Sequence, residues 1–249
     1  MKLLFIILLA FQGAFLQAQD INAMLAEAVK LEAKPDESAA FEKFKIILKY
    51  DPDNLRALVH CSELCSRIGN RQKNEKLRDK YYEVAVNYAK KALQLYPGSD
   101  DANVALAIAT GRTVLVKSGK EKIAAVKDIK RYAETALKIN PSNFKAWHII
   151  GKWHYEVSNL NMMEKAAVKI FYGGVPESSL QASINAYEKA KSLKDGFLLN
   201  YLELAKAYKR NGEKQKAIAH LKQLLPLPAQ TEDDPRIKNE ARELLRAWN

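Results

Sequence analysis

The side chains that could do chemistry in this 249-residue chain are few, and their spacing matches no familiar catalytic or metal-binding pattern. Its four histidines are His60, His148, His154 and His220, and none belongs to a His-Glu-x-x-His or comparable motif. His148 and His154 lie six residues apart, which places them on different faces of one helix. A lone histidine on a helix more often packs or lines a groove than acts as a base. We therefore expect packing or binding roles for them.

Two cysteines, Cys61 and Cys65, lie four residues apart on one predicted helix. This spacing puts both on one face, but it holds the Cα atoms near the upper end of the disulfide range and aims both Cβ atoms the same way. A metal site would need two more ligands, and the only candidate nearby, His60, points elsewhere on the helix. The pair is interpreted as two reduced, packed thiols.

Other catalytic signals are also weak. Gly173-Gly174 lacks the flanking glycines and the lysine–hydroxyl pair of a phosphate-binding loop. No Ser, Cys or Asp has a partner nearby in sequence that would make it a nucleophile. The prediction is a protein that is not an enzyme and that carries no catalytic residue, metal or cofactor.

The first eighteen residues form a segment of their own, MKLLFIILLAFQGAFLQA. Lys2 precedes an apolar run from Leu3 to Phe11, and Leu16-Gln17-Ala18 is a plausible cleavage site, as in a secretory signal peptide. The run is short for a membrane span, which needs about 20 residues. We predict a cleavable signal and a periplasmic or secreted protein; a retained anchor is the alternative.

The formal net charge of +11 restricts the partners that the chain could bind. A basic balance suits nucleic acid, an acidic membrane face or an acidic polypeptide, or it belongs to an ordinary solvated helix surface. Export argues against nucleic acid. An acidic polypeptide and an anionic lipid remain the candidate partners.

One closing pattern recurs along the chain and indicates which elements position these side chains. A helix-sized segment carries a small or aromatic residue and an alanine, and then stops at proline or an acidic residue. The copies are AFEKFKIILKYDPDN (40–54), AVNYAKKALQLYPGSD (85–100), DIKRYAETALKINPSN (128–143), ASINAYEKAKSLKDG (182–196) and KAIAHLKQLLPLPAQ (216–230). This pattern is typical of the second helix of a tetratricopeptide repeat, a helix–turn–helix unit of about 34 residues. The predicted fold is all-α: a tetratricopeptide-repeat-like superhelix of helix pairs with a C-terminal capping helix.

The repeats divide the chain into four predicted parts. Residues 1–18 are the signal peptide, 19–54 a degenerate N-terminal repeat, 55–232 repeats with insertions between their two helices, and 233–249 the capping helix. The insertions follow from stops spaced by 44 to 54 residues from Pro52 to Asp195. We expect the third insertion to contain a helix over Met162 to Phe171, and Ser178-Ser179 to cap the next one. Gly151 and Ala205 should let a neighbouring helix approach closely.

With these insertions, repeats two to five resemble the regulator of microtubule dynamics family. The resemblance rests on SGKEKI (118–123), ALKINPSN (136–143), WHIIGKWHYEVSNLNMMEKAAVKIFYGGVPESSLQAS (147–183) and NYLELAKAY (200–208), and covers roughly Leu55 to Leu227. It implies an all-helical fold without catalytic activity. For animal members it implies association with microtubules, or membrane tethering with phospholipid bound in the repeat domain. The export signal departs from that pattern, and an exported bacterial-type member would not meet a microtubule.

The predicted site lies on the concave face, because first helices line the inside of such a superhelix. The inward positions are Arg56, Val59, Glu63, Arg67, Val104, Ile108, Arg112, Lys145, His148, Lys152, Tyr155, Leu199, Leu202, Lys206 and Lys209. Among these the predicted electrostatic residues are Arg112, Lys152, Lys206 and Lys209, and the stacking and hydrogen-bonding residues are His148 and Tyr155.

Two ligands suit this basic groove. One is a protein or peptide partner with an acidic segment or a terminal carboxylate. The alternative is an anionic phospholipid, in a lipid-binding or lipid-transfer module. The third insertion should separate them, because Met162, Met163, Ile170, Phe171 and Tyr172 form a lid for an acyl chain only if they fold over the groove. A solvated groove with no specific ligand is the remaining alternative.

Overall fold

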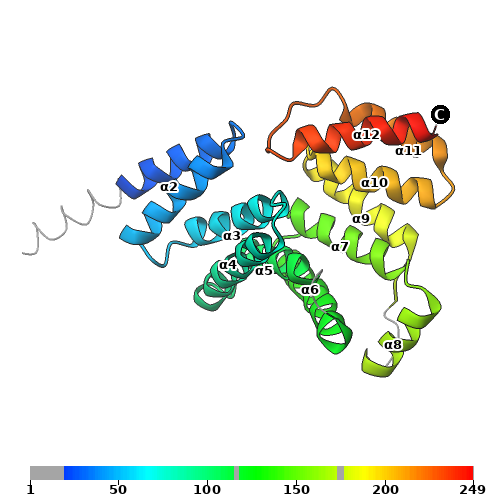
Figure 1. Cartoon of the computed structure of the whole chain (residues 1–249), viewed down its shortest axis with the longest axis horizontal. Helices are drawn as coiled ribbons and strands as arrows, with labels where there is room; N and C mark the ends of the chain where they lie inside the picture. The colour runs from blue at the N-terminus through cyan, green and yellow to red at the C-terminus, as the bar shows by residue number, and fades with distance from the viewer. Residues whose placement is uncertain (1–19, 115–117, 173–176, 249) are drawn as a thin grey trace, which may run out of the picture.

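Helices account for every regular element in the described part of the chain. The computed structural model describes residues 20–114, 118–172 and 177–248; the predicted signal peptide and Gly173-Gly174 lie outside these ranges. An N-terminal helix (residues 20–32) is followed by eleven labelled helices (Figure 1). Helices α3 (Leu55–Asn70), α5 (Asp100–Thr113), α7 (Phe144–Val157) and α10 (Leu198–Arg210) pack in succession as an inner layer. The outer layer holds α2 (Glu37–Tyr50), α4 (Glu75–Leu95), α6 (Gly119–Ile139), α9 (Leu180–Leu193) and α11 (Lys214–Leu224). This confirms the predicted all-α stack of helix pairs.

The closing patterns stop one helix and begin the next. Asn54, Ser99 and Asn143 stand at the end of the sequences DPDN, PGS and PSN, and each is the N-cap of an inner-layer helix. Their side-chain oxygens accept hydrogen bonds from the backbone N–H groups of Ala57, Ala102 and Ala146 at 3.0, 3.1 and 3.0 Å. Such a bond satisfies a donor that the first helical turn leaves free. The repeated stop is therefore also a repeated start.

The insertions lengthen outer helices and add one short helix. Helices α4 and α6 each have 21 residues, against 11 in α11. The third insertion forms α8 (Met162–Tyr172), as predicted, and Ser179 then caps α9 by accepting from the N–H of Ala182 at 3.0 Å. Helix α8 contacts α6 in the outer layer and extends away from the body of the molecule (Figure 1).

Small residues set the spacing between helices. A Cβ atom on Gly151 would lie 2.7 Å from Cδ1 of Tyr187, whose side chain is fully buried. The carbonyl of Gly151 also accepts a hydrogen bond from the hydroxyl of Ser183 at 2.7 Å. Ala205 is fully buried against the last helices. The predicted close approach at Gly151 is confirmed, and it joins α7 to α9.

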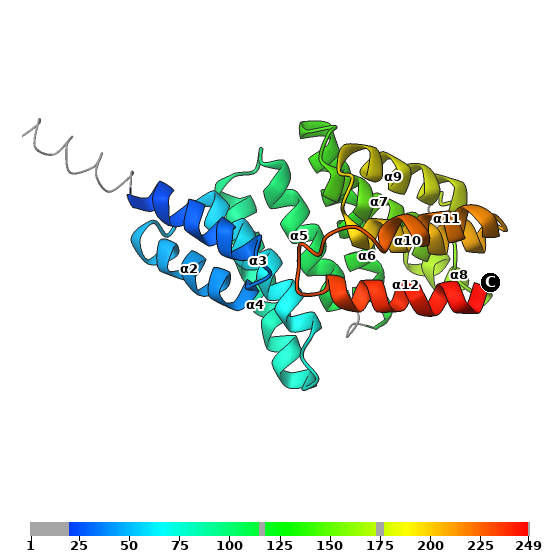
Figure 2. The ribbon, with the colours of Figure 1, turned by 90° about the horizontal axis from the view of Figure 1, so that it is seen from above.

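The last helix, α12 (Asp234–Trp248), closes the apolar end of the stack. Ile237 and Ala241 pack with Leu202 and Leu221, and α12 contacts both α10 and α11. The connection before it, residues 225–233, returns toward α2 and α3, so that segments far apart in sequence lie side by side (Figures 1 and 2). No helix of the described residues is long and apolar enough to span a membrane.

Candidate binding groove

Ion pairs join the inner-layer helices through lysines that were predicted to line a groove. The ammonium of Lys145 on α7 lies 2.6 Å from Glu63 on α3, and that of Lys152 lies 2.7 Å from Glu203 on α10. Lys206 contacts the other oxygen of Glu203 at 3.1 Å and then reaches Glu240 on α12 at 2.7 Å. Together these six side chains link α3, α7, α10 and α12. We call them the ion-pair ladder: Glu63, Lys145, Lys152, Glu203, Lys206 and Glu240.

Two of the three ladder carboxylates, those of Glu63 and Glu203, are buried, and their lysines are partly in water. Glu63 and Glu203 are 5% and 7% exposed, whereas the side chain of Lys152 is 45% exposed. Burial alone would raise the pKa of Glu203, but the charges of Lys152 and Lys206 lower it below its ordinary value. Lys145 and Arg67 do the same for the pKa of Glu63. Both acids are therefore ionised at neutral pH and hold the lysines that surround them.

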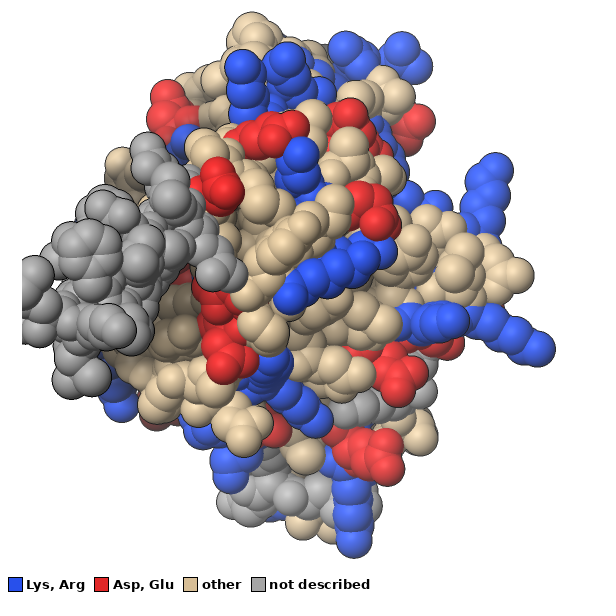
Figure 3. Space-filling model, turned by 90° about the vertical axis from the view of Figure 1, so that its left-hand side faces the viewer, with Lys and Arg blue, Asp and Glu red and all other residues tan. Residues whose placement is uncertain are grey.

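Two of the six predicted site residues, Lys152 and Lys206, thus belong to the ladder. Desolvation would lower the pKa of each ammonium, yet the charge of Glu203 raises it. The charges of these lysines are therefore compensated by carboxylates of the same chain. On the side drawn in Figure 3, acidic and basic side chains are also interspersed. Two of these acidic partners could have been predicted from the sequence, because residues three or four apart on a helix are neighbours. Glu156 lies four residues after Lys152, and Glu203 lies three residues before Lys206.

His148 is a neutral ring packed between α7, α9 and the start of α10. Its Nδ1 is 3.0 Å from Oδ1 of Asn200, whose Nδ2 donates to the carbonyl of Tyr187 at 2.9 Å. Because the Asn200 amide already donates from its nitrogen, Nδ1 of His148 carries the proton and donates to Oδ1. The ring centroid lies 4.9 Å from that of Phe197 and 5.3 Å from that of Tyr187. Burial lowers the pKa of His148, which keeps the ring uncharged.

Tyr155 and Lys209 lie at the C-terminal end of the groove. The ring of Tyr155 lies between two cations: the Lys152 ammonium is 5.6 Å from its centroid and the Arg210 guanidinium 5.0 Å. Lys209 lies over the ring of Trp248 at 5.8 Å. All three are cation–π contacts of the kind that stabilise by about 0.5–1 kcal/mol at exposed sites. Tyr155 is therefore a stacking platform, as the sequence suggested, but its partners are the protein's own cations.

Arg112 is the predicted site residue that comes from α5. It lies near the end of α5, where its Nη1 donates to Oδ1 of Asn70 at 3.2 Å. It forms no salt bridge with a carboxylate among residues 20–114, 118–172 and 177–248. Desolvation lowers its pKa, and the nearby charges of Tyr82 and Asp233 act in the opposite direction. Its charge in turn contributes to lowering the pKa of His148 on α7.

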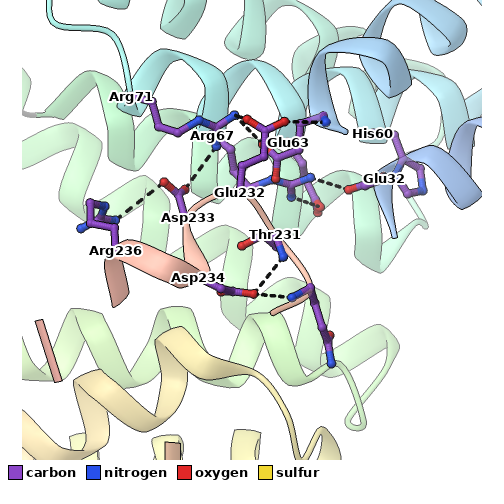
Figure 4. Close-up of polar contacts among 12 residues, drawn as sticks. Glu32, His60, Glu63, Arg67, Arg71, Thr231, Glu232, Asp233, Asp234 and Arg236 are labelled. Carbon is purple, nitrogen blue, oxygen red and sulfur yellow. Dashed lines mark hydrogen bonds and ion pairs between the residues drawn. The ribbon is translucent and has the colours of Figure 1, made fainter. Parts of the chain in front are cut away.

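A second cluster, at the N-terminal end of the stack, involves residues that no sequence pattern joins (Figure 4). Arg67 on α3 donates from Nε to Glu37 at 2.8 Å and contacts Glu32 on the N-terminal helix. Arg71 donates to the other Glu37 oxygen at 2.7 Å and lies 3.1 Å from Glu232 in the connection before α12. Glu37 is fully buried, so these two arginines supply its compensating charge. Glu232 comes from the opposite end of the chain.

The apolar part of the predicted groove is used for packing. Val59, Val104 and Leu202 are 6%, 0% and 1% exposed, which corrects their placement as lining residues: neighbouring inner helices approach closely enough to cover them. Met162 and Met163 on α8 are 87% and 83% exposed and cover no groove. The side chains of residues 171 and 172 lie outside the described set.

The cysteines and the remaining histidines pack as expected. Cys61 and Cys65 are free and buried, and burial raises the pKa of both thiols, that of Cys65 to about 12. His60 stacks on Phe44 at 4.6 Å, and His220 stacks on Tyr208 at 5.2 Å. Within the described ranges, no group of three or more His, Cys, Asp or Glu residues has the arrangement to hold a metal ion.

Comparison with known families and proteins agrees with this architecture. Residues 24–249 match the family model described as "Regulator of microtubule dynamics protein 1-3". "Regulator of microtubule dynamics protein 1" of Bos taurus is 29% identical over 219 residues, which span 86% of this chain and 68% of that protein. The protein of the same name from Caenorhabditis elegans is 27% identical over 185 residues, 74% of this chain and 80% of its own length.

Among solved structures, a thermophilic TPR protein of Thermus thermophilus superposes with a TM-score of 0.65. The alignment covers 91% of this chain and 99% of that one, at 16% sequence identity. At that identity the likeness concerns the fold: a stack of helix pairs of tetratricopeptide type.

Proposed function

The chain belongs to the regulator of microtubule dynamics family, and we propose that it is a non-catalytic scaffold that binds an acidic segment or terminal carboxylate of a protein partner on its concave face. The observation that carries this proposal is the ion-pair ladder. Lys145 and Lys152 reach solvent while their partners Glu63 and Glu203 are buried, so an incoming carboxylate can share Lys152 or Lys145 without displacing either acid into water. The relatives' names refer to microtubule dynamics; for this chain we propose only the chemistry of the partner.

The geometry suits an extended peptide. Lys145, Lys152, Lys206 and Lys209 come from two inner helices, and Tyr155 and His148 add aromatic surface between them. A chain running along this face could place successive carboxylates near successive lysines, and each exposed pair would contribute about 0–1 kcal/mol. Several such contacts give a weak, salt-sensitive interaction, which is typical of transient scaffolds.

A phospholipid is the less favoured ligand. An acyl chain needs a continuous apolar cavity, whereas Val59, Val104 and Leu202 are buried between helices and Met162 and Met163 lie away from the concave face. Native mass spectrometry of the purified protein distinguishes the two ligands. A co-purified phospholipid would favour a lipid carrier.

The proposal is tested with a fluorescein-labelled hexaglutamate peptide, measured by fluorescence anisotropy at two salt concentrations. We expect Lys152→Gln combined with Lys209→Gln to weaken binding about three- to tenfold and to reduce its salt dependence, because two of the cations that meet the peptide are lost. Circular dichroism should show an intact helical fold, since Glu203 keeps Lys206 as a partner.

The matched control is Lys189→Gln with Lys222→Gln. Both lysines are exposed on outer helices, so the change in net charge is the same. If the two pairs weaken binding equally, attraction is a diffuse property of the surface and the groove is not the site. A hexalysine peptide should not bind either protein.

A further inference from the structure

The connection between α11 and α12 is held at its far end mainly by charge. We call residues 226–233 of this connection the strap. Most side chains of residues 226–230 are exposed, and burial begins at Asp233. Asp234 shapes the end of the strap, because its Oδ2 accepts from the N–H groups of Gln230 and Thr231 at 2.7 and 2.8 Å. This turn presents the adjacent carboxylates of Glu232 and Asp233 to the N-terminal helices (Figure 4).

Three polar contacts receive these two carboxylates. The backbone N–H of Glu37, in the first turn of α2, donates to Oε1 of Glu232 at 2.8 Å. The other Glu232 oxygen lies 3.1 Å from Arg71, and Oδ2 of Asp233 lies 3.7 Å from the same guanidinium. A free N–H at a helix N-terminus and a planar guanidinium are both donors that suit a carboxylate. The receiving surface therefore already holds an acidic peptide, which is part of this chain.

The fit of the strap is incomplete. Nη1 of Arg71 and Oδ1 of Asp233 are buried without a hydrogen bond, and the 3.7 Å contact is longer than a normal one. Arg71 must also serve the buried carboxylate of Glu37, and Arg112 has an amide rather than a carboxylate as its hydrogen-bond partner. A buried donor left without a hydrogen bond is unfavourable, because it has lost its bonds to water without replacement. A ligand that satisfied it could therefore compete with the strap.

We infer that Arg71 and the N-terminus of α2 form a docking site for two adjacent carboxylates, which the strap residues Glu232 and Asp233 occupy until an acidic peptide displaces them. The inference rests on the proposed function and adds a first step to it, in which the acidic peptide displaces the strap before it binds the ladder. Displacing the strap frees the N-terminal end of the groove, so that the peptide can continue onto the ion-pair ladder. The strap is thus an internal competitor that lowers the affinity for acidic partners.

The test removes the strap charges with Glu232→Gln and Asp233→Asn in the full chain. Spin labels at Ser38→Cys on α2 and Ala229→Cys in the strap, both exposed positions, report the separation of the strap from α2 by double electron–electron resonance. The native cysteines are buried. We expect a single short distance in the parent protein, a longer or broader distribution in the variant, and binding of hexaglutamate at least about threefold tighter.

Two further variants control for charge and folding. Glu83→Gln with Glu243→Gln removes the same number of charges from exposed positions and should change neither the distance nor the affinity. Glu232→Asp with Asp233→Glu keeps both carboxylates and should retain most of the parent behaviour. Circular dichroism of each variant confirms that the helices are intact.

The outcomes separate the two proposals. An unchanged distance in the strap variant overturns the docking site. A changed distance with unchanged affinity also overturns it, while the proposed function stands if Lys152→Gln with Lys209→Gln still weakens binding. If no variant binds hexaglutamate, both proposals fail. Opening of the strap with tighter binding supports the inference.

Discussion

At the scale of single residues, the inner surface depends on carboxylates that are each shared by two cations. Glu37 serves Arg67 and Arg71, Glu203 serves Lys152 and Lys206, and Glu63 lies between Lys145 and Arg67. Removing one partner of a buried pair leaves a charge without compensation, which costs more than the pair itself contributes. Stability should therefore respond to acid more strongly than to the loss of any one lysine.

Glu32 gives the clearest pH prediction. Burial would raise its pKa, but hydrogen bonds and charge from His60 and Arg67 lower it from 4.5 to about 2. Because the folded pKa lies below the unfolded one, the stabilisation is complete above about pH 4.5 and is lost as the pH falls through 2. Glu32→Gln should lower the free energy of unfolding by about 1–3 kcal/mol at pH 7 in urea denaturation. At pH 3 the difference in the free energy of unfolding between the variant and the parent protein should be smaller than at pH 7, by up to about 2 kcal/mol.

Glu27→Gln is the control, since this acid lies on the same helix, is 57% exposed and pairs only with Lys43. It should change stability by less than about 0.5 kcal/mol. A deficit for Glu32→Gln that is equally large at pH 7 and pH 3 would show that Glu32 acts through packing and not through its charge.

At the scale of elements, a single glycine sets how closely α7 and α9 approach. The approach of α7 to α9 has the ring of Tyr187 lying directly on the backbone of Gly151. This contact also orients Asn200, whose amide donates to the carbonyl of Tyr187 and accepts from His148. The backbone spacing at one glycine thus determines the position of a groove residue.

We expect Gly151→Ala to destabilise the fold by about 1–3 kcal/mol, because the new methyl group would overlap a buried ring that has no room to move. The measurement is urea denaturation followed by circular dichroism. His148 should also move, which is detectable as a change in its imidazole NMR shifts.

Gly111→Ala is the matched control. The added Cβ would lie 3.8 Å from Ile129, an ordinary contact, on the helix α5. Alanine favours a helix interior over glycine by about 0.5–1 kcal/mol, so this variant should be slightly more stable than the parent. Equal losses at both glycines would argue against a specific close approach at Gly151.

At the scale of the whole molecule, the last helix and its strap bind the two ends of the stack. Helix α12 covers the apolar end through Ile237 and Ala241 and supplies Glu240 to the ladder. The strap returns to α2 and α3 through Glu232. In an open array of repeats each unit contacts only its neighbours. Here the first and last repeats also contact each other.

Truncation before Asp234 should therefore do more than shorten the chain. We expect exposure of Leu202 and Leu221, aggregation in size-exclusion chromatography and a lower melting temperature, since the apolar end of the stack loses its cover. Ile237→Ala should show a graded loss of about 2–5 kcal/mol. Glu243→Ala, exposed on the same helix, should not. A truncated protein that stays monomeric and melts like the parent would contradict a capping role.

The sequence by itself determined the stack of helix pairs. Helix starts and stops are local, so Asn54, Ser99 and Asn143 could be identified from their own neighbourhoods, and the close approach at Gly151 follows from the repeat pattern. The lysines of the concave face were also predictable, because they lie at fixed positions on the first helices. Their neighbours on the same helix, such as Glu203 beside Lys206, could have been counted with them.

Only the tertiary structure decided what those lysines meet. The contact of Lys145 with Glu63 joins residues 82 positions apart, and that of Glu37 with Glu232 joins residues 195 apart. Such contacts depend on the curvature of the whole stack, which accumulates from small rotations at each interface. No local sequence pattern therefore predicts this accumulated curvature. The sequence therefore indicated a basic face, and the fold turned it into a ladder of ion pairs with an acidic strap at one end.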